Sequence, residues 1–172
     1  MAGGIPLASL FRLKNSEEGA TRVTDLMSKH VWTIGMSDSC HEAAARMCRE
    51  KIRHLPVVAD DGTLQGIVTD RDLRHHLFGP GVFGQIGSTA VHALLKACPI
   101  REIMTTPVLS ISVGASVEEA ARLMRQHRIG SLPVVETGRV VGILTETDLL
   151  RHIVRADEAC CEEGECIVVS YP

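Results

Sequence analysis

The segment GIVTDRD at residues 66–72 recurs as GILTETD at residues 142–148, and this pair of segments decides the fold. In both copies a run of aliphatic residues leads directly into Thr-x-x-Asp and a more polar stretch. This pattern predicts a strand that ends where a helix begins. The first N–H groups of a helix have no partner within it and the helix dipole is positive there, so such a junction suits an anion such as a phosphate.

The similarity between the two copies extends well upstream of these segments. At a spacing of 77 positions, residues 31–34 match residues 108–111, residues 39–44 match residues 116–121, and residues 52–58 match residues 129–135. The spacing falls to 76 for GIVTDRD and GILTETD, which indicates a deletion of one residue. Two copies of a unit of about fifty residues therefore fill most of the chain.

A helix is predicted near the start of each copy. Ser39 stands three residues before Glu42, and Ser116 stands three residues before Glu119. This is the spacing of a capping box at a helix N-terminus.

A hairpin follows each of these helices. Pro56 and Pro133 open short β-branched runs, and residues 60–62 and 137–138 have the composition of tight turns. Each copy is therefore predicted as a short strand, a helix, a hairpin and a closing helix. A three-stranded sheet covered on one face is marginal alone, so we expect an α/β (α+β) fold in which the two copies pack sheet to sheet.

The composition excludes several classes of protein. The 172 residues carry a formal charge of −3 and only 3% aromatic residues, whereas general nucleic-acid binding needs a basic surface or stacking side chains. No apolar run approaches the roughly 18–20 residues of a membrane-spanning helix, and the N-terminus lacks the pattern of a secretory signal. We therefore expect a cytoplasmic protein and do not expect nucleic acid or a membrane as its partner.

The cysteines are predicted to be free thiols. Cys40, Cys48 and Cys98 fall in partly buried, helical patterns, where a free cysteine behaves as a small hydrophobic residue, so a disulfide framework is not expected. In the C-terminal tail, Cys160, Cys161 and Cys166 could bind a soft metal. Without a second cysteine pair this signal is weak, so we predict a mobile or docked tail, its role left open, and no metal site.

The two Thr-x-x-Asp sequences permit two interpretations. Thr and Asp at this spacing are ordinary helix-capping residues. The carboxylate can also accept two hydrogen bonds from the vicinal diol of a ribose, and the Thr hydroxyl can donate to a phosphate. Two matched copies, each joined to a Leu-Pro-Val-Val strand, favour binding over capping alone.

These features together resemble a tandem pair of CBS domains, named after cystathionine beta-synthase. The markers are Met27 and Met104 closing a short opening helix, the Leu-Pro-Val strands and the two G-x-x-T-x-x-D segments. The resemblance implies two β-α-β-β-α motifs related by a pseudo-twofold axis, with clefts that bind adenine nucleotides or related adenosyl ligands in the family. The expected parts are a flexible lead-in at residues 1–21, the first motif at 22–78, a Gly-rich loop and linker helix at 79–99, the second motif at 100–155 and the tail at 156–172.

The resemblance also implies ligand-binding residues. Asp72 and Asp148 are expected to hold the ribose hydroxyls, while Thr69 and Thr145 face ribose or phosphate. Thr147 adds a hydroxyl where the first motif has Arg71, so we expect the second-motif site to hold ribose better. The residues expected to line the sugar and adenine pocket are Lys29, Ile34, Thr106 and Ile111, and those expected to face the phosphates are Arg53, His54, Gly130 and Ser131. Arg53 is the best phosphate donor of these, because a guanidinium is always charged and binds bidentately.

The predicted function is an energy-sensing, regulatory module that binds AMP, ADP, ATP or a related adenosyl ligand, without catalytic activity or a catalytic cofactor. The spacing suggests no nucleophile and base pair, and the sequence has no Walker-type loop or zinc signature. Two alternatives stay open: a structural dimerisation module without a ligand, and a slow nucleotide hydrolase that uses Asp72 or Asp148 with a metal.

The expected partners, besides the nucleotide, are a second copy of the chain and an unidentified target protein. Leu149, Leu150, Ile153 and Val154 form an apolar stripe on the closing helix of the second motif. The resemblance implies a homodimer, because two CBS pairs form a flat disc in the family with contacts on the closing helices, and this stripe supplies an apolar surface there.

Overall fold

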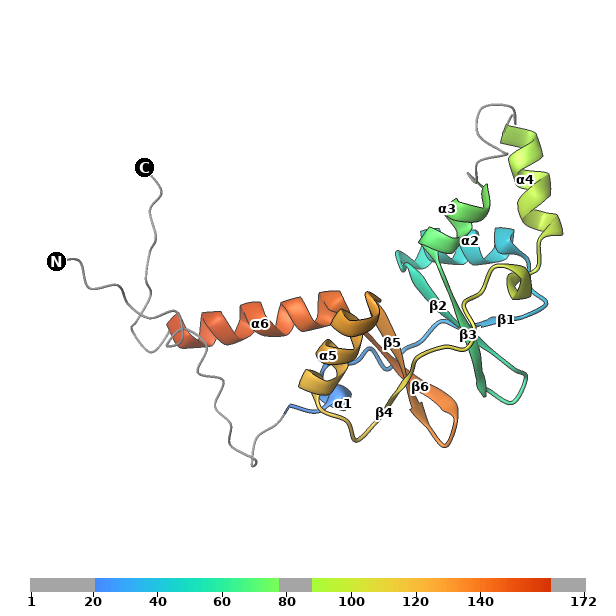
Figure 1. The fold of residues 1–172 in the computed structure, drawn as a ribbon. Coiled ribbons are helices and arrows are strands. Elements are labelled where there is room, and N and C mark those ends of the chain that lie inside the picture. The colour runs from blue at the N-terminus through green and yellow to red at the C-terminus, as the bar shows by residue number, and fades with distance from the viewer. Residues whose placement is uncertain (1–20, 78–87, 162–172) are drawn as a thin grey trace, which may run out of the picture.

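Two three-stranded sheets and their helices form the part of the chain that the computed structural model describes, residues 21–77 and 88–161 (Figure 1). The elements are, in chain order, α1 (Val23–Leu26), β1 (Ile34–Gly35), α2 (Cys40–Glu50), β2 (His54–Val58), β3 (Leu64–Thr69), α3 (Asp70–Leu77), α4 (Ser88–Ala97), the 3-10 helix η2 (Ile100–Glu102), β4 (Ile111–Ser112), α5 (Val117–His127), β5 (Ser131–Glu136), β6 (Arg139–Thr145) and α6 (Glu146–Cys161). The order β1-β2-β3 recurs as β4-β5-β6, so the predicted duplication and the α+β class are confirmed.

The two sheets have the same pattern of strand pairing. The middle strand, β2 or β5, pairs in parallel with the short strand before it and antiparallel with the strand after it. Ile34 lies opposite Val57 in the first sheet, and Ile111 lies opposite Val134 in the second.

The predicted N-caps are confirmed in both repeats. Ser39 Oγ accepts a hydrogen bond from Glu42 N at 3.2 Å, and Ser116 Oγ accepts one from Glu119 N at 3.1 Å. These bonds satisfy amide groups that the first helical turn leaves without a partner. Helices α2 and α5 therefore start where the sequence indicates.

The predicted turns are confirmed as well. Between β5 and β6, Thr137 and Gly138 have φ of 48° and 82°, the pair of positive values that a two-residue type I′ hairpin requires. Between β2 and β3, Gly62 has φ of 84°, and Asp61 Oδ1 accepts a hydrogen bond from Thr63 N at 2.9 Å.

Each half of the molecule takes its opening segment from the other repeat. Ser28 N donates to Ile143 O at 2.9 Å, and Ile143 N donates to Ser28 O at 3.0 Å, so the segment after α1 pairs with β6. The segment after η2 pairs with β3, because Thr105 N donates to Ile67 O at 2.8 Å and Ile67 N donates to Thr105 O at 3.2 Å. A structural half is therefore not the same as a sequence repeat.

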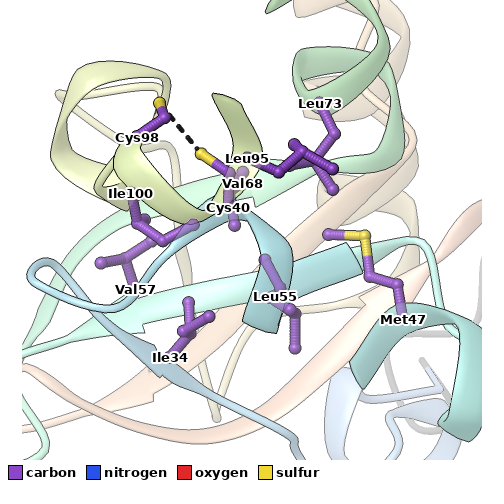
Figure 2. Packing of buried hydrophobic residues seen from close by; sticks show 11 residues of the cluster. Ile34, Cys40, Met47, Leu55, Val57, Val68, Leu73, Leu95, Cys98 and Ile100 are labelled. Carbon is purple, nitrogen blue, oxygen red and sulfur yellow. Dashed lines mark hydrogen bonds between the residues drawn. The ribbon is translucent and has the colours of Figure 1, made fainter. Parts of the chain in front are cut away.

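The two hydrophobic cores follow this exchange. Val23 of α1 is fully buried in the core around β5 and β6, with Leu132 among its neighbours. Ile100 of η2 is fully buried in the core around β2 and β3, with Leu55 and Val57 (Figure 2). Neither repeat completes its own core, so the two must fold together.

A methionine of each opening segment lies on a glycine of the opposite sheet. A Cβ on Gly66 would lie 3.0 Å from both Met104 Sδ and Thr105 O, closer than real Cβ contacts normally come. A Cβ on Gly142 would overlap Met27 Sδ. The glycine that begins each G-x-x-T-x-x-D segment is thus required by the close approach of another chain segment.

Some expectations differ from the structure or lie outside it. Cys40 and Cys98 are buried as expected, whereas Cys48 is exposed, so its predicted burial is wrong. The predicted linker helix is present as α4, and α6 continues past residue 155 to Cys161. The lead-in up to residue 20, most of the Gly-rich loop (78–87) and the tail from residue 162 lie outside the described residues. Within the described part of the chain, no helix has both the length and the apolar character needed to cross a bilayer.

The substitution Gly142→Ala should lower stability by about 1–3 kcal/mol, because the new methyl group overpacks against Met27. In a chain of this size that corresponds to roughly 2–10 °C in the thermal unfolding midpoint, measured by circular dichroism. Gly114→Ala is the matched control, since a Cβ there meets no atom within 4 Å. Combining Gly142→Ala with Met27→Ala should cost less than the sum of the single changes. Equal midpoints for the two glycine variants would refute the packing argument.

Candidate functional site

Two clefts lie between the halves, one beside each Thr-x-x-Asp sequence. The Asp148 cleft, of about 260 Å³, is lined by side chains from the segments 28–32, 51–54 and 143–151. The Asp72 cleft, of about 550 Å³, is lined by the segments 67–74, 105–109 and 128–131, together with Arg53, His54 and Glu146. Each cleft therefore combines the Thr-x-x-Asp of one repeat with the opening segment and the helix-to-strand connection of the other.

In each cleft the threonine positions the aspartate. Thr69 N and Thr69 Oγ1 donate to Asp72 Oδ2 at 2.8 and 2.7 Å, and Thr145 N and Thr145 Oγ1 donate to Asp148 Oδ2 at 2.9 and 2.7 Å. A hydroxyl has one proton to donate, so neither threonine can donate to a phosphate while this bond is present. The structure thus gives both threonines a role in positioning the aspartate, and the expected contact of Thr69 and Thr145 with ribose or phosphate stays a prediction.

The second carboxylate oxygen is the one available to a ligand. Within the described part of the chain, the hydrogen bonds to Asp72 involve Oδ2 and not Oδ1. Asp148 Oδ1 lies 3.9 Å from Arg151 Nη1, a much looser contact than the bonds to its Oδ2. Each aspartate therefore offers Oδ1 to a hydroxyl donor while Oδ2 fixes its orientation.

Arg53 and His54, at the start of β2, line both clefts. Their counterparts Gly130 and Ser131 line the Asp72 cleft. A Cβ on Gly130 would lie 3.3 Å from Glu146 Oε2 and 3.8 Å from His54 Nε2, so the glycine leaves room for these two side chains. The first repeat thus contributes a guanidinium and an imidazole to both clefts.

The environment of His54 favours its neutral form. Burial lowers the pKa of His54 below 6.5, and the neighbouring Arg53 lowers it further. Asp70, Glu146 and Asp72 oppose this shift but do not overcome it. A bound phosphate would add negative charge beside the imidazole and favour its protonation.

The structure brings ten of the predicted site residues to the clefts and leaves four elsewhere. Those at the clefts are Arg53, His54, Thr69, Arg71, Asp72, Gly130, Ser131, Thr145, Thr147 and Asp148. Ile34 and Ile111 are 2% and 5% exposed and belong to the two cores, so they do not line the pocket as expected. Lys29 and Thr106 also lie outside the lining, and Thr106 Oγ1 donates to Gln65 O at 3.2 Å.

Sequence reasoning missed several basic residues at the clefts, including one that ends a helix beside each cleft. Lys51 and Arg128 end α2 and α5 with φ of 54° and 55°, a left-handed conformation that non-glycine residues rarely adopt. Lys51 lines the Asp148 cleft and Arg128 lines the Asp72 cleft. The sequence signal that could have found them is the positive charge that both repeats carry at this equivalent position.

A second missed pair makes the clefts chemically unequal. Trp32 lines the Asp148 cleft, where its ring meets His30 edge-on at 4.9 Å between centroids, and Leu109 takes the equivalent place in the Asp72 cleft. The smaller cleft therefore has an aromatic wall. The larger cleft has more guanidinium groups, with Arg71 and Arg74 on its α3 side.

Comparison with known families agrees with this duplicated arrangement. The family model for the CBS domain matches twice, at residues 23–79 and 100–155. The chain belongs to the CBS domain family. The CBS domain pair thus accounts for both halves of the described structure and for the two clefts between them.

Two curated relatives show how this CBS pair occurs in other proteins. A CBS domain-containing protein of Dictyostelium discoideum is 36% identical over 137 residues, which cover 79% of this chain and 93% of the relative. The uncharacterized protein MJ1404 of Methanocaldococcus jannaschii is 35% identical over 136 residues, covering 77% of this chain but only 32% of the relative. The chain therefore spans about a third of that archaeal protein.

Solved CBS pairs similar to this chain hold adenosyl ligands. The CBS domain pair of protein MJ0100, in complex with 5′-methylthioadenosine and S-adenosyl-L-methionine, superposes with a TM-score of 0.68 and 30% identity, covering 80% of this chain and 99% of that one. CBSX2 in complex with AMP superposes with a TM-score of 0.65 and 26% identity, covering 80% and 98%.

The lowered pKa of His54 predicts a pH-dependent contribution to stability. Because the pKa is lower in the folded than in the unfolded chain, this contribution is complete above pH 6.5 and is lost as the pH falls below it. As the pH is lowered from about 7.5 to about 5.5, the stability of the His54→Gln variant should therefore rise relative to that of the unsubstituted protein. Thermal unfolding across this range measures the difference, with exposed His127→Gln as the control. If the difference in unfolding midpoint between His54→Gln and the unsubstituted protein stays constant with pH, the lowered pKa of His54 is contradicted.

Proposed function

We propose that the protein is a cytoplasmic regulatory module that senses an adenine nucleotide or a related adenosyl ligand. The observation that supports it best is the duplicated Thr–Asp pair, which holds one carboxylate in a fixed orientation in each cleft. A ribose diol donates two hydrogen bonds, and a carboxylate that is already oriented accepts them at a low entropic cost. The ligands of the similar CBS pairs all contain a ribose.

The two clefts suit different parts of such a ligand. In the Asp148 cleft, Thr147 and the wall formed by Trp32 favour a nucleoside, because a base can stack on an aromatic face. In the Asp72 cleft, Arg71 and Arg128 favour phosphate groups, since guanidinium binds phosphate bidentately. Arg53 lines both clefts, so it can contact the phosphate of a ligand bound in either one.

Thermal shift and isothermal titration against AMP, ADP, ATP, S-adenosylmethionine and NAD test the proposal. At a ligand concentration about a hundred times the dissociation constant, binding should stabilise the folded protein by about 2.7 kcal/mol, roughly 5–10 °C in the unfolding midpoint. The nucleotide should be recovered unchanged after prolonged incubation with Mg²⁺. No binding to any of the five would favour the structural dimerisation module instead, and loss of the nucleotide would favour the hydrolase.

Matched aspartate variants test the roles of the two clefts. In Asp148→Asn, the N–H and O–H groups of Thr145 still need an acceptor, so the amide oxygen takes the Oδ2 position. The NH₂ group then takes the Oδ1 position, where it cannot accept a hydrogen bond from a ribose hydroxyl. Losing a charged acceptor for the ribose should weaken the tighter binding event by about ten- to a hundredfold. Asp72→Asn makes the same change in the other cleft and should weaken that event less. A larger loss for Asp72→Asn would show that the clefts are ranked wrongly.

We also propose that the protein acts as a homodimer through α6. Leu150, Ile153 and Val154 lie on this helix and are 62%, 56% and 56% exposed, whereas Leu149, expected in the same stripe, packs against the second core. Their spacing places them on one face, and an exposed apolar stripe is typical of a surface that another protein covers. A second copy of the chain offers an identical stripe to match it, as a twofold interface requires.

Light scattering at tens of micromolar should give twice the mass of 18.6 kDa. Ile153→Glu should shift the mass toward the monomer without lowering nucleotide affinity, because a charge cannot be buried cheaply in an apolar interface. Glu118→Gln, an exposed position on α5, serves as the control. A monomer mass for the unsubstituted protein would reject the dimer.

A further inference from the structure

Two buried thiols lie against each other where the linker meets the first core. Cys40 is the first residue of α2, and Cys98 directly follows α4. Their Sγ atoms are 3.1 Å apart, and the two residues are 0% and 4% exposed (Figure 2). The contact joins positions separated by 58 residues along the chain.

Backbone hydrogen bonds hold the two cysteines opposite each other. Ser39 forms an antiparallel bridge with Pro99, and Cys40 N donates to Cys98 O at 2.8 Å. Residues opposite each other in an antiparallel pair have Cα atoms about 4.5–5.5 Å apart, within the range of about 4.4–6.8 Å that disulfides span. A bond of about 2.05 Å needs the sulfur atoms to approach by only about 1 Å. Side-chain rotation alone can supply this movement.

The other repeat shows that the fold does not require this pair. There Arg22 forms the same bridge with Ser116, and Val117 N donates to Thr21 O at 3.0 Å. Val117 and Thr21 therefore occupy the places of Cys40 and Cys98, and the same backbone ladder forms without thiols. The backbone ladder therefore does not require a cysteine at either position, and the first repeat places two thiols in contact inside its core.

We propose that Cys40 and Cys98 are a redox modification site that forms a reversible disulfide with a peroxide as oxidant. The Cys98 sulfur attacks one peroxide oxygen, the O–O bond breaks, and the departing hydroxide takes the thiol proton and leaves as water. The Cys40 sulfur then attacks the sulfenic sulfur of Cys98, the S–O bond breaks, and the hydroxide leaves with the Cys40 proton as a second water. Two electrons pass from the sulfurs to the peroxide, and a dithiol reductant returns them.

Burial determines the order and the speed of these steps. Cys98 reacts first because it retains 4% exposure, whereas Cys40 has none. Burial, together with the neighbouring Cys98 and Glu102, raises the pKa of Cys40 to about 12. Cys40 is therefore protonated at neutral pH, and since the thiolate is the nucleophile, bond formation is slow and accelerates as the pH rises.

The bond would clamp the linker to the first half of the molecule. It closes a loop that contains β2, β3, α3 and α4. Beyond Cys98 the chain continues through η2 to Thr105, which pairs with β3 and lines the Asp72 cleft. Closing a loop of this length should raise the unfolding midpoint by about 5–15 °C.

Peroxide treatment of the folded full chain, followed by alkylation and peptide mapping by mass spectrometry, tests the proposal. A peptide linking Cys40 to Cys98 should appear, disappear with dithiothreitol, and accompany the rise in the unfolding midpoint. Cys40→Val and Cys98→Thr, the residues of the other repeat, should fold and show neither the link nor the rise. Cys48→Ser removes a thiol that is exposed in the described part of the chain, and it should leave both the link and the rise unchanged. Oxidation confined to other cysteines, or a link that forms only after denaturation, would overturn the proposal.

Discussion

The antiparallel pairing of each opening segment with the last strand of the other repeat is the constraint on which this structure depends. Ser28 pairs with Ile143 and Thr105 pairs with Ile67, each by two backbone hydrogen bonds. This exchange brings Val23 and Ile100 into the cores of the opposite halves. Each repeat then depends on the other for its core, which explains why a unit of about fifty residues need not be stable alone.

The clefts are a direct consequence of the same exchange. Because the opening segment of one repeat lies on the last strand of the other, its neighbours meet the helix N-terminus that follows this strand. The Thr–Asp pair at that N-terminus uses one carboxylate oxygen for local hydrogen bonds and leaves the other for a ligand. One aspartate side chain can therefore take part in helix capping and still have an oxygen available for a ligand. The sequence presents these two roles as alternatives.

The duplicated backbone carries side chains that are not duplicated. Equivalent positions hold Trp32 and Leu109 at the clefts, and Arg53 and Gly130 before the Leu-Pro strands. The ladder at the start of α2 and α5 has Cys40 in one repeat and Val117 in the other. A common backbone thus supports two unequal clefts and one thiol pair, because local substitutions leave the backbone hydrogen bonds intact.

The sequence by itself determined the repeat, the order of elements, the N-caps, the turns and the Thr-x-x-Asp junctions, since each of these depends on residues close together in the chain. It also determined the family, because the markers are linear motifs. Only the tertiary structure decided that Ile34 and Ile111 face the cores and that Cys40 meets Cys98. The direction of a side chain on a strand and the meeting of residues far apart in the chain depend on the register with which distant segments pair. Between distant segments that register results from packing the two halves together, so the sequence of either segment alone does not show it.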